Sequence, residues 1–278
     1  MSTRGMPLRP STMFLVKMSE MRFTCLIITV ALLFTLLPLL TDAGGPGPED
    51  IGSAANFQKI DEMLLRGENQ QALEMLGGLS KGGPDSVEKL WRLSRVYYEM
   101  GRLDEKRALQ LFRQSEEYAR TAIAADSDSG DSYKWLAIAL GAQAKYSDTK
   151  SQVHQSREIK QSIERAIALN PNDDISYLVL SRWHYKISGL GTIARTLAKI
   201  IYGGVPKASL AKAEELLLQA IALHDRISHR YNLAKVYDRM ERSEDKKIQL
   251  QKAMLLPVTF PEEAEEQEKA REKLQVQK

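Results

Sequence analysis

The stretch RAIALNP, residues 165–171, is the part of the sequence that decides the fold. Its small and apolar residues follow a helical spacing and end at Asn-Pro, so we expect one helix to stop here and another to begin near Asp173. The same alternation recurs at residues 122–127 and 220–225, and more loosely at 253–257. The sequence therefore predicts a series of related helices joined by short turns.

A second pattern shows how these helices pair. A leucine and a small residue follow each of the first three junctions, at Leu136-Ala137, Leu180-Ser181 and Leu233-Ala234. Small residues on both helices of an antiparallel pair let the backbones approach, which is the logic of the tetratricopeptide repeat. The alanines that align, at 122, 166, 220 and 253, are unevenly spaced, so inserts lie in the second and third units. We predict an all-α, tetratricopeptide-like solenoid of helical hairpins with a degenerate repeat and an N-terminal apolar anchor.

Composition limits the chemistry that the chain can perform. The 278 residues are 43% hydrophobic and 27% charged, enough for one sizeable helical body. The only cysteine, Cys25, lies in the apolar N-terminal run, which excludes a disulfide framework, a cysteine zinc site and a thiol nucleophile in the body. The net charge of +3 comes from the first 41 residues, and the rest is balanced, so nucleic acid is not expected as a partner.

Residues 23–40, FTCLIITVALLFTLLPLL, form an uncharged run that follows basic residues. The run is just long enough to span a bilayer, and we expect an uncleaved anchor. A cleaved signal peptide is the alternative, because Thr41-Asp42-Ala43 offers small residues at a cleavage site. The expected organisation is a basic segment at 1–22, the apolar run at 23–40, a Gly/Pro linker at 41–52, the repeat domain at 53–258, and a charged helix or tail at 259–278.

Two indicators disagree on which side of a membrane the body would lie. The body has no Asn-x-Ser/Thr site and no cysteine, which favours the cytosol. Basic residues before the apolar run and acidic ones after it favour translocation of the body. From the residues alone, a cytosolic repeat domain and a lumenal or secreted one both stay open.

The segment 187–206 does not fit a plain repeat. Glycines break it, and residues 193–202 form an expected amphipathic helix. No acidic residue occurs between Asp174 and Glu214, although six basic residues do. We therefore predict a partner-binding or lipid-binding face here, unless these cations pair with carboxylates of neighbouring helices. Its candidate residues are Arg182, Lys186, Arg195, Leu197, Lys199, Lys207 and Lys212.

No arrangement of residues predicts catalysis, a metal or a cofactor. The histidines, at 154, 184, 224 and 229, lack metal-ligand spacing, and no Gly-x-Ser-x-Gly elbow is present. Gly189-Leu190-Gly191 lacks the third glycine and the preceding strand of a phosphate-binding loop. We expect a protein that binds and does not catalyse.

Tryptophans occur on three successive expected helices. They are interpreted mainly as wedges between repeats, and alternatively as the wall of a shared apolar groove. Together with the junction alanines they form a packing signature: Trp91, Trp135, Ala166, Trp183, Ala220 and Ala253.

Four motifs in order resemble the regulator of microtubule dynamics family: LWRLSR at 90–95, KWLAI at 134–138, IERAIALNPND at 163–173 and RWHY at 182–185. The resemblance covers about residues 55–256. It implies a tetratricopeptide-like adaptor that associates with microtubules and spindle poles. Some members of the family carry a membrane anchor and work at contacts between the endoplasmic reticulum and mitochondria, where lipid handling has been proposed. The resemblance therefore implies a cytosolic repeat domain anchored to the endoplasmic reticulum or the outer mitochondrial membrane, with the reticulum lumen or secretion as the alternative.

These observations lead to one functional prediction with two alternatives. The leading one is a membrane-anchored helical-repeat adaptor that associates with microtubules or tubulin, and with protein partners through its repeat groove. The alternatives are a lipid-binding or lipid-transfer module at membrane contact sites, and a lumenal or secreted repeat protein.

Overall fold

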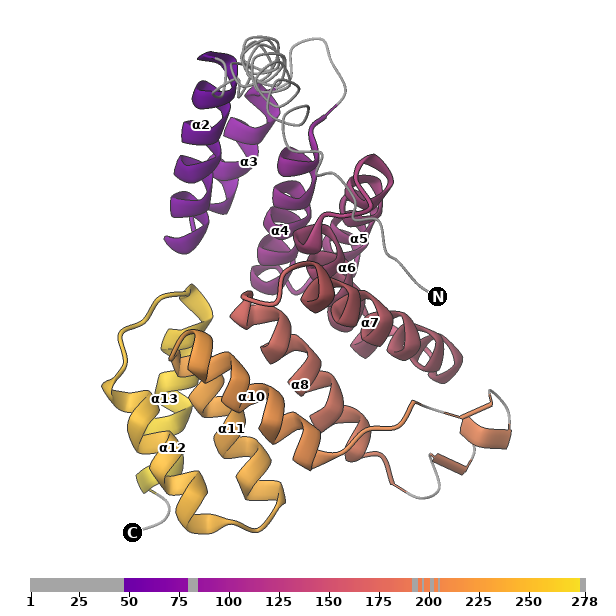
Figure 1. Cartoon of the computed structure of the whole chain (residues 1–278), viewed down its shortest axis with the longest axis vertical. Coiled ribbons are helices and arrows are strands. Elements are labelled where there is room, and N and C mark those ends of the chain that lie inside the picture. Colours follow the sequence, from indigo (N-terminus) through magenta and orange to yellow (C-terminus); the bar gives the residue numbers. More distant parts are fainter. Residues whose placement is uncertain are drawn as a thin grey trace, which may run out of the picture. The chain divides into compact units, whose positions relative to one another are not determined.

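The structure is a computed structural model that describes residues 48–79, 85–191, 195–196, 198–200, 203–204 and 206–275, with side chains from Ala54 onward. The chain divides into two units, Met1–Ser53 and Ala54–Lys278, and the features below belong to the second unit. Helices make up its regular structure, and no strand occurs in the described ranges (Figure 1). The all-α fold predicted from the sequence is confirmed.

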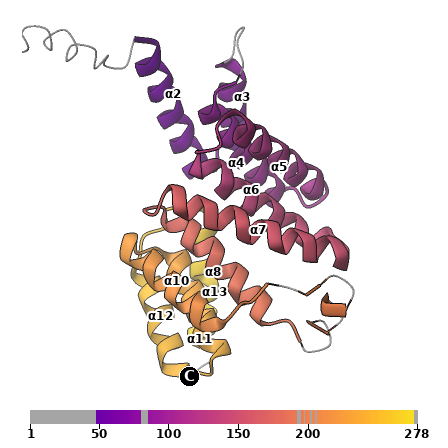
Figure 2. The same cartoon turned by 45° about the vertical axis from the view of Figure 1, so that its right-hand side comes forward.

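The helices follow one another as antiparallel pairs. In chain order they are α2 (Pro48–Leu65), α3 (Asn69–Gly78), α4 (Val87–Leu103), α5 (Ala108–Ala125), α6 (Gly130–Gln143), α7 (Thr149–Leu169), α8 (Asp174–Ser188), α10 (Leu210–Leu223), α11 (Ile227–Arg239), α12 (Ser243–Leu255) and α13 (Pro261–Gln275). A short 3₁₀ turn, Ala144–Tyr146, precedes α7. The principal pairs are α4 with α5, α6 with α7, α8 with α10, and α11 with α12 (Figure 2).

Small residues lie where the paired helices meet. Ala122, Ala166, Ala220 and Ala253 on the second helices are almost fully buried. On the first helices the matching positions are also buried, and Ser94 Oγ lies 3.1 Å from Ser115 Oγ across the α4–α5 contact. Close approach at small residues lets the larger neighbouring side chains fill the grooves between helices, which produces the repeated hairpins.

Polar caps fix where several helices begin. Ser86, Ser129, Asp148, Asp173 and Ser209 each accept a hydrogen bond from a backbone N–H in the first turn of the helix that follows. Such caps satisfy N–H groups that have no partner inside the helix. The junction at residues 165–171 is therefore followed by a capped helix, as its sequence predicts.

Two segments extend the plain repeat. The polar residues before Ser156 form the first turns of α7 rather than a separate element. The larger insertion, residues 189–209, separates α8 from its partner α10, and we call it the α8–α10 segment (Figure 2). The expected amphipathic helix at 193–202 falls partly outside the described residues.

The first and last helices reach beyond the limits expected for the repeat domain. α2 begins at Pro48, inside the segment assigned to a linker, and proline followed by two acidic residues is a favourable helix start. α13 lies in the segment expected to be a solvated cap or a frayed tail. It packs on α11 and α12, and its Ala270 is fully buried.

Candidate functional site

A groove of about 790 Å³ runs along the first helices of successive pairs, α4, α6 and α8. Residues of α2, α7 and α11 and the start of α13 complete its wall, and Ala198 of the α8–α10 segment also lines it. Apolar side chains such as Ile138, Val153 and Leu178 cover much of the surface. A groove of this size and character is suited to binding a small molecule or a short peptide.

All three tryptophans line this groove, and each is more than nine-tenths buried. Their indole N–H groups differ in one respect. Trp91 Nε1 donates to Glu88 Oε2 at 3.2 Å, and Trp183 Nε1 donates to the Ser156 carbonyl oxygen at 2.8 Å. Trp135 Nε1 is buried and has no hydrogen-bond partner among the described residues. The tryptophans thus serve both as packing wedges and as groove wall.

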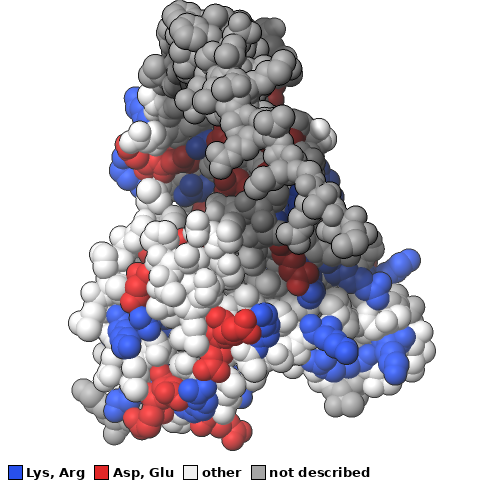
Figure 3. Space-filling model, in the orientation of Figure 1, with Lys and Arg blue, Asp and Glu red and all other residues white. Residues whose placement is uncertain are grey.

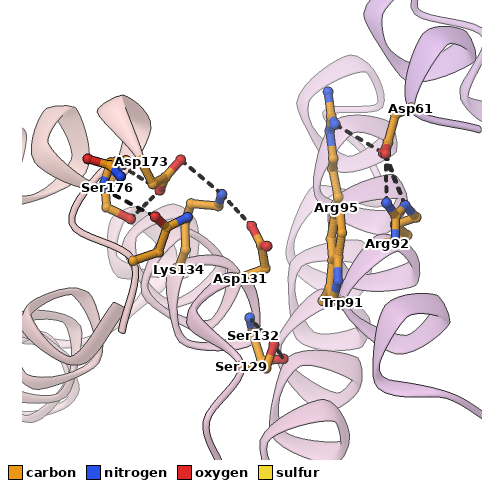
Figure 4. A network of polar contacts seen from close by, with 12 residues as sticks. Asp61, Trp91, Arg92, Arg95, Ser129, Asp131, Ser132, Lys134, Asp173 and Ser176 are labelled. Carbon is orange, nitrogen blue, oxygen red and sulfur yellow. Dashed lines mark hydrogen bonds and ion pairs between the residues drawn. The ribbon is translucent and has the colours of Figure 1, made fainter. Parts of the chain in front are cut away.

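Ion pairs surround the groove. Lys134 Nζ lies 2.5 Å from Asp131 Oδ1 and 3.2 Å from Asp173 Oδ1, between the two carboxylates (Figure 4). Burial opposes the charge on Lys134, but the two carboxylates outweigh it and raise its pKa. This lysine is therefore charged and held in place by its own helix and by the cap of α8.

A second network links α2 to α4. Arg92 Nη2 lies 2.7 Å from Asp61 Oδ2, and Arg95 Nη1 lies 3.6 Å from Asp61 Oδ1, so both arginines face one carboxylate (Figure 4). Arg95 Nε has no hydrogen-bond partner in the described part of the chain. Burial lowers the pKa of Arg95, and burial together with Glu262 raises the pKa of Glu99. The Arg95 side chain is a groove-lining cation whose hydrogen bonding is incomplete.

The third polar cluster surrounds Asp174, at the start of α8. Its carboxylate oxygens lie 2.5 Å from Arg226 Nε and 3.0 Å from His224 Nδ1. His229 Nε2 lies 3.3 Å from Asp174 but makes no hydrogen bond, while His229 Nδ1 donates to the His224 carbonyl oxygen. Burial lowers the pKa of His229, so a neutral imidazole is favoured. Within the described ranges no group of three or more acidic, histidine or cysteine side chains is arranged to hold a metal ion.

The structure separates the candidate basic residues into two groups. Arg182 pairs with Glu266 at 2.9 Å and Lys212 with Glu215 at 2.6 Å, and Arg195 donates to the carbonyl oxygens of Ile187 and Leu190.

Three other candidates, Lys186, Lys199 and Lys207, are exposed, and their side chains have no partner among the described residues. We call these three lysines the basic face. Basic side chains, in blue, gather at the lower right of Figure 3, over the region of the α8–α10 segment. Leu197 lies outside the described residues.

The packing signature occupies the interior. Its tryptophans and its alanines, Ala166, Ala220 and Ala253, are all buried.

Sequence reasoning missed three residues of interest: Arg95 and Ser156 in the groove wall, and Glu263 in α13. The available signal for Glu263 was Pro261 at a helix start with a glutamate two positions later, a spacing typical of a capped N-terminus.

Where the structure describes the chain, no helix is long and apolar enough to cross a membrane. The run 23–40 that was predicted as an anchor lies outside those residues.

Comparison with known proteins agrees with the fold and the motif order. A thermophilic TPR protein from Thermus thermophilus superposes with a TM-score of 0.61 at 19% identity, covering 80% of this chain and 98% of that one, which supports the fold.

Two relatives show how the chain compares in sequence. A regulator of microtubule dynamics protein 1 from Bos taurus is 26% identical over 236 residues, covering 74% of each chain. A regulator of microtubule dynamics protein 3 from Xenopus laevis is 29% identical over 168 residues, covering 59% of this chain and only 36% of that relative.

The family model described as "Regulator of microtubule dynamics protein 1-3" matches residues 56–278, which include the four principal helix pairs and all the residues that line the groove. The chain belongs to the regulator of microtubule dynamics family.

Proposed function

We propose that the protein is a membrane-anchored adaptor that associates with microtubules through the basic face. The observation that carries this proposal is a set of exposed lysines, Lys186, Lys199 and Lys207, that have no partner among the described residues and lie in a stretch of sequence without acidic residues. The names of its relatives refer to microtubule dynamics, which supports a cytoskeletal partner. Cations that are not neutralised within the protein remain available for an acidic surface such as that of tubulin.

The pairing of the other candidates narrows this proposal. Arg182 and Lys212 already contact carboxylates, and Arg195 holds backbone carbonyl groups, so their charges serve the protein's own structure. The lysines of the basic face lose fewer internal contacts when they bind a partner. The role of the protein in this proposal is binding, with no chemical step.

Co-sedimentation of the full-length protein with microtubules tests the basic face. Lys199→Glu combined with Lys207→Glu should weaken binding about tenfold or more, because each contact between a lysine and an anionic surface is worth roughly 1 kcal/mol. Higher salt should weaken wild-type binding in the same way. Lys247→Glu combined with Lys252→Glu is the matched control, since it makes the same charge change at exposed positions of α12. Equal pelleting of the two double variants would refute a role for the basic face.

The anchor is a separate part of the proposal and rests on the apolar run at 23–40. Mass spectrometry of the mature N-terminus, combined with alkaline extraction of membranes, tests it. An intact N-terminus in the membrane pellet is expected. A chain that begins at Gly44 would contradict the anchor and favour the lumenal or secreted alternative.

A lipid-binding role is the second candidate. The groove has an apolar wall and a volume of about 790 Å³, which an acyl chain could enter. In this alternative Leu197 and the rest of the expected amphipathic helix at 193–202 would cover the groove. Leu197→Asp should then abolish lipid uptake and leave microtubule binding largely intact.

A further inference from the structure

The first half of α13 is strongly acidic, and several of its carboxylates face the rest of the protein. Residues 262–268 include five glutamates and no basic residue. Glu262 contacts a side chain of α4, Glu263 accepts from the first turn of α11, and Glu266 contacts Arg182 of α8. α13 is therefore attached to the repeats largely through carboxylates.

The contact made by Glu266 involves one of the candidate basic residues. Arg182 Nη2 donates to Glu266 Oε1 at 2.9 Å, and Ser228 Oγ of α11 donates to Glu266 Oε2 at 2.6 Å. Asn232 Nδ2 lies 3.4 Å from Oε1 of the same carboxylate. Side chains of α8 and α11 thus supply three donors that hold one carboxylate of α13.

Without this contact, Arg182 would extend the basic face. Lys186 lies one turn further along α8, and side chains four positions apart lie on the same side of a helix. Both residues are exposed, and both line the groove. Among the described residues, Glu266 is the one carboxylate within ion-pair distance of Arg182. Removal of Glu266 from this contact would therefore add a cation to the basic face.

A second cation depends on the same carboxylate. Lys235 of α11 is half-buried, and its Nζ lies 5.3 Å from the centroid of the Tyr185 ring. Burial and the neighbouring Arg182 lower the pKa of Lys235, and Glu266 acts in the opposite direction. Glu266 therefore offsets positive charge on both α8 and α11.

The ion pair between Arg182 and Glu266 lies where a partner can compete for it. The Arg182 side chain is 44% exposed, and the Glu266 side chain is 15% exposed. Ion pairs that remain partly in water contribute little to stability, so exchanging one carboxylate for another costs little. Glu263, by contrast, is fully buried and accepts from backbone N–H groups, so it can keep the start of α13 attached when the Glu266 contact opens.

We propose that α13 is an autoinhibitory helix, in which Glu266 neutralises Arg182 in the free protein and is displaced when the basic face meets an acidic partner surface. This inference rests on the proposed microtubule contact and describes its regulation. Glu266 is an internal competitor that has the same chemistry as the carboxylates of the partner. Once Glu266 is displaced, Arg182 joins Lys186 in contact with the partner.

Co-sedimentation of the full-length protein with microtubules, against a blank without them, tests this competition. Glu266→Gln removes the negative charge and keeps an oxygen that accepts hydrogen bonds, so affinity should rise about fivefold, the value of one added cation contact. Glu268→Gln is the matched control, because it makes the same charge change at an exposed residue of α13 that pairs with Arg271. It should leave affinity nearly unchanged. Equal affinities of the two variants would overturn the proposal.

A variant of Arg182 distinguishes neutralisation of this residue from a general loosening of α13. Arg182→Gln alone should not raise affinity, and combined with Glu266→Gln it should abolish the gain. If the gain came only from loosening of α13, Arg182→Gln alone would raise affinity as Glu266→Gln does, because both break the same contact. That result, or a gain that persists in the double variant, would refute autoinhibition through Arg182.

The autoinhibition and the microtubule contact fail in different ways. If Lys199→Glu with Lys207→Glu weakens binding but Glu266→Gln binds as the wild type does, the basic face stands and the autoinhibition is wrong. If neither the wild type nor Glu266→Gln sediments above the blank, the proposed function is wrong and the autoinhibition fails with it. Sedimentation of Glu266→Gln without sedimentation of the wild type would support both.

Discussion

α13 and the α8–α10 segment both lie outside the plain repeat, but polar groups hold them in opposite ways. At the start of α13, Glu263 is fully buried and accepts hydrogen bonds from the backbone N–H groups of Thr259, Phe260 and Ser228. Within the α8–α10 segment, Arg195 donates to the carbonyl oxygen of Ile187 in the last turn of α8 and to that of Leu190 just beyond it. An anion thus satisfies the beginning of one helix and a cation satisfies the end of another, as the helix dipole favours.

The comparison shows that a helix poor in apolar residues can still be fixed in place. The sequence of α13 is mostly charged, and its position depends on a buried carboxylate with several donors. Glu266 adds contacts to Ser228, Asn232 and Arg182. The described part of the α8–α10 segment has fewer such contacts, and Ile200 within it is 75% exposed.

The largest effect should come from Glu263→Ala. The substitution leaves three backbone donors without their buried acceptor, which should cost about 3 kcal/mol of unfolding free energy. Chemical denaturation checks the loss, and faster hydrogen exchange in α13 checks its location. Glu265→Ala, on the exposed face of the same helix, should leave the denaturation midpoint unchanged. Equal behaviour of the two variants would mean that α13 is not held by Glu263.

A smaller effect is expected from Arg195→Ala. It removes two hydrogen bonds, to the carbonyl oxygens of Ile187 in α8 and of Leu190 just after it, with a cost of about 1 kcal/mol. Lys199→Ala, at an exposed position of the same segment, is the control and should have no measurable effect. If Arg195→Ala matched Glu263→Ala in size, the contrast between the two regions would be wrong.

The smallest effect should appear as a dependence of stability on pH. Burial lowers the pKa of both His184 and His229, and His184 Nδ1 accepts a hydrogen bond from the Ser209 N–H at the end of the α8–α10 segment. The unfolded chain therefore binds protons more readily than the folded chain, and stability present above pH of about 6.5 is lost as the pH falls below it.

Thermal unfolding at several pH values between about 7.5 and about 5.5 measures this slope. The range extends about one pH unit on either side of the ordinary histidine pKa of about 6.5. His184→Gln should reduce the slope, because the neutral amide can still accept from Ser209 and does not titrate in this range. His154→Gln, at an exposed position of α7, is the control. A slope that is the same in all three proteins would contradict the assignment to His184.

The repeat fold could be predicted from the sequence because its signals are local. The alternation at residues 165–171 identified a helix end, Asp173 supplied a cap, and Ala166 marked a close contact between helices. Each of these depends on neighbours within a few positions along the chain. The family likeness rested on the same kind of ordered local motif.

The polar details of the site could not be predicted in this way. The indole N–H of Trp183 donates to a carbonyl group 27 positions earlier, whereas that of Trp135 has no partner among the residues that the structure describes. The sequence around each tryptophan does not reveal this difference. The position of Glu263 after Pro261 is typical of a helix start, but the sequence does not reveal that its carboxylate also accepts from Ser228 of α11. Pairing of the basic candidates likewise depended on distant carboxylates, such as Glu266 for Arg182.

The contact between Arg102 and Glu262 has a consequence for folding. In most repeat proteins each unit touches only its neighbours, so the ends can unravel independently. Here Arg102, at the end of α4, bonds to Glu262, 160 positions further along the chain, and Pro261 lies close to Gly67 in the turn after α2. The last helix is thereby coupled to the first pairs. We therefore expect the two ends of the array to unfold together in one cooperative step rather than separately.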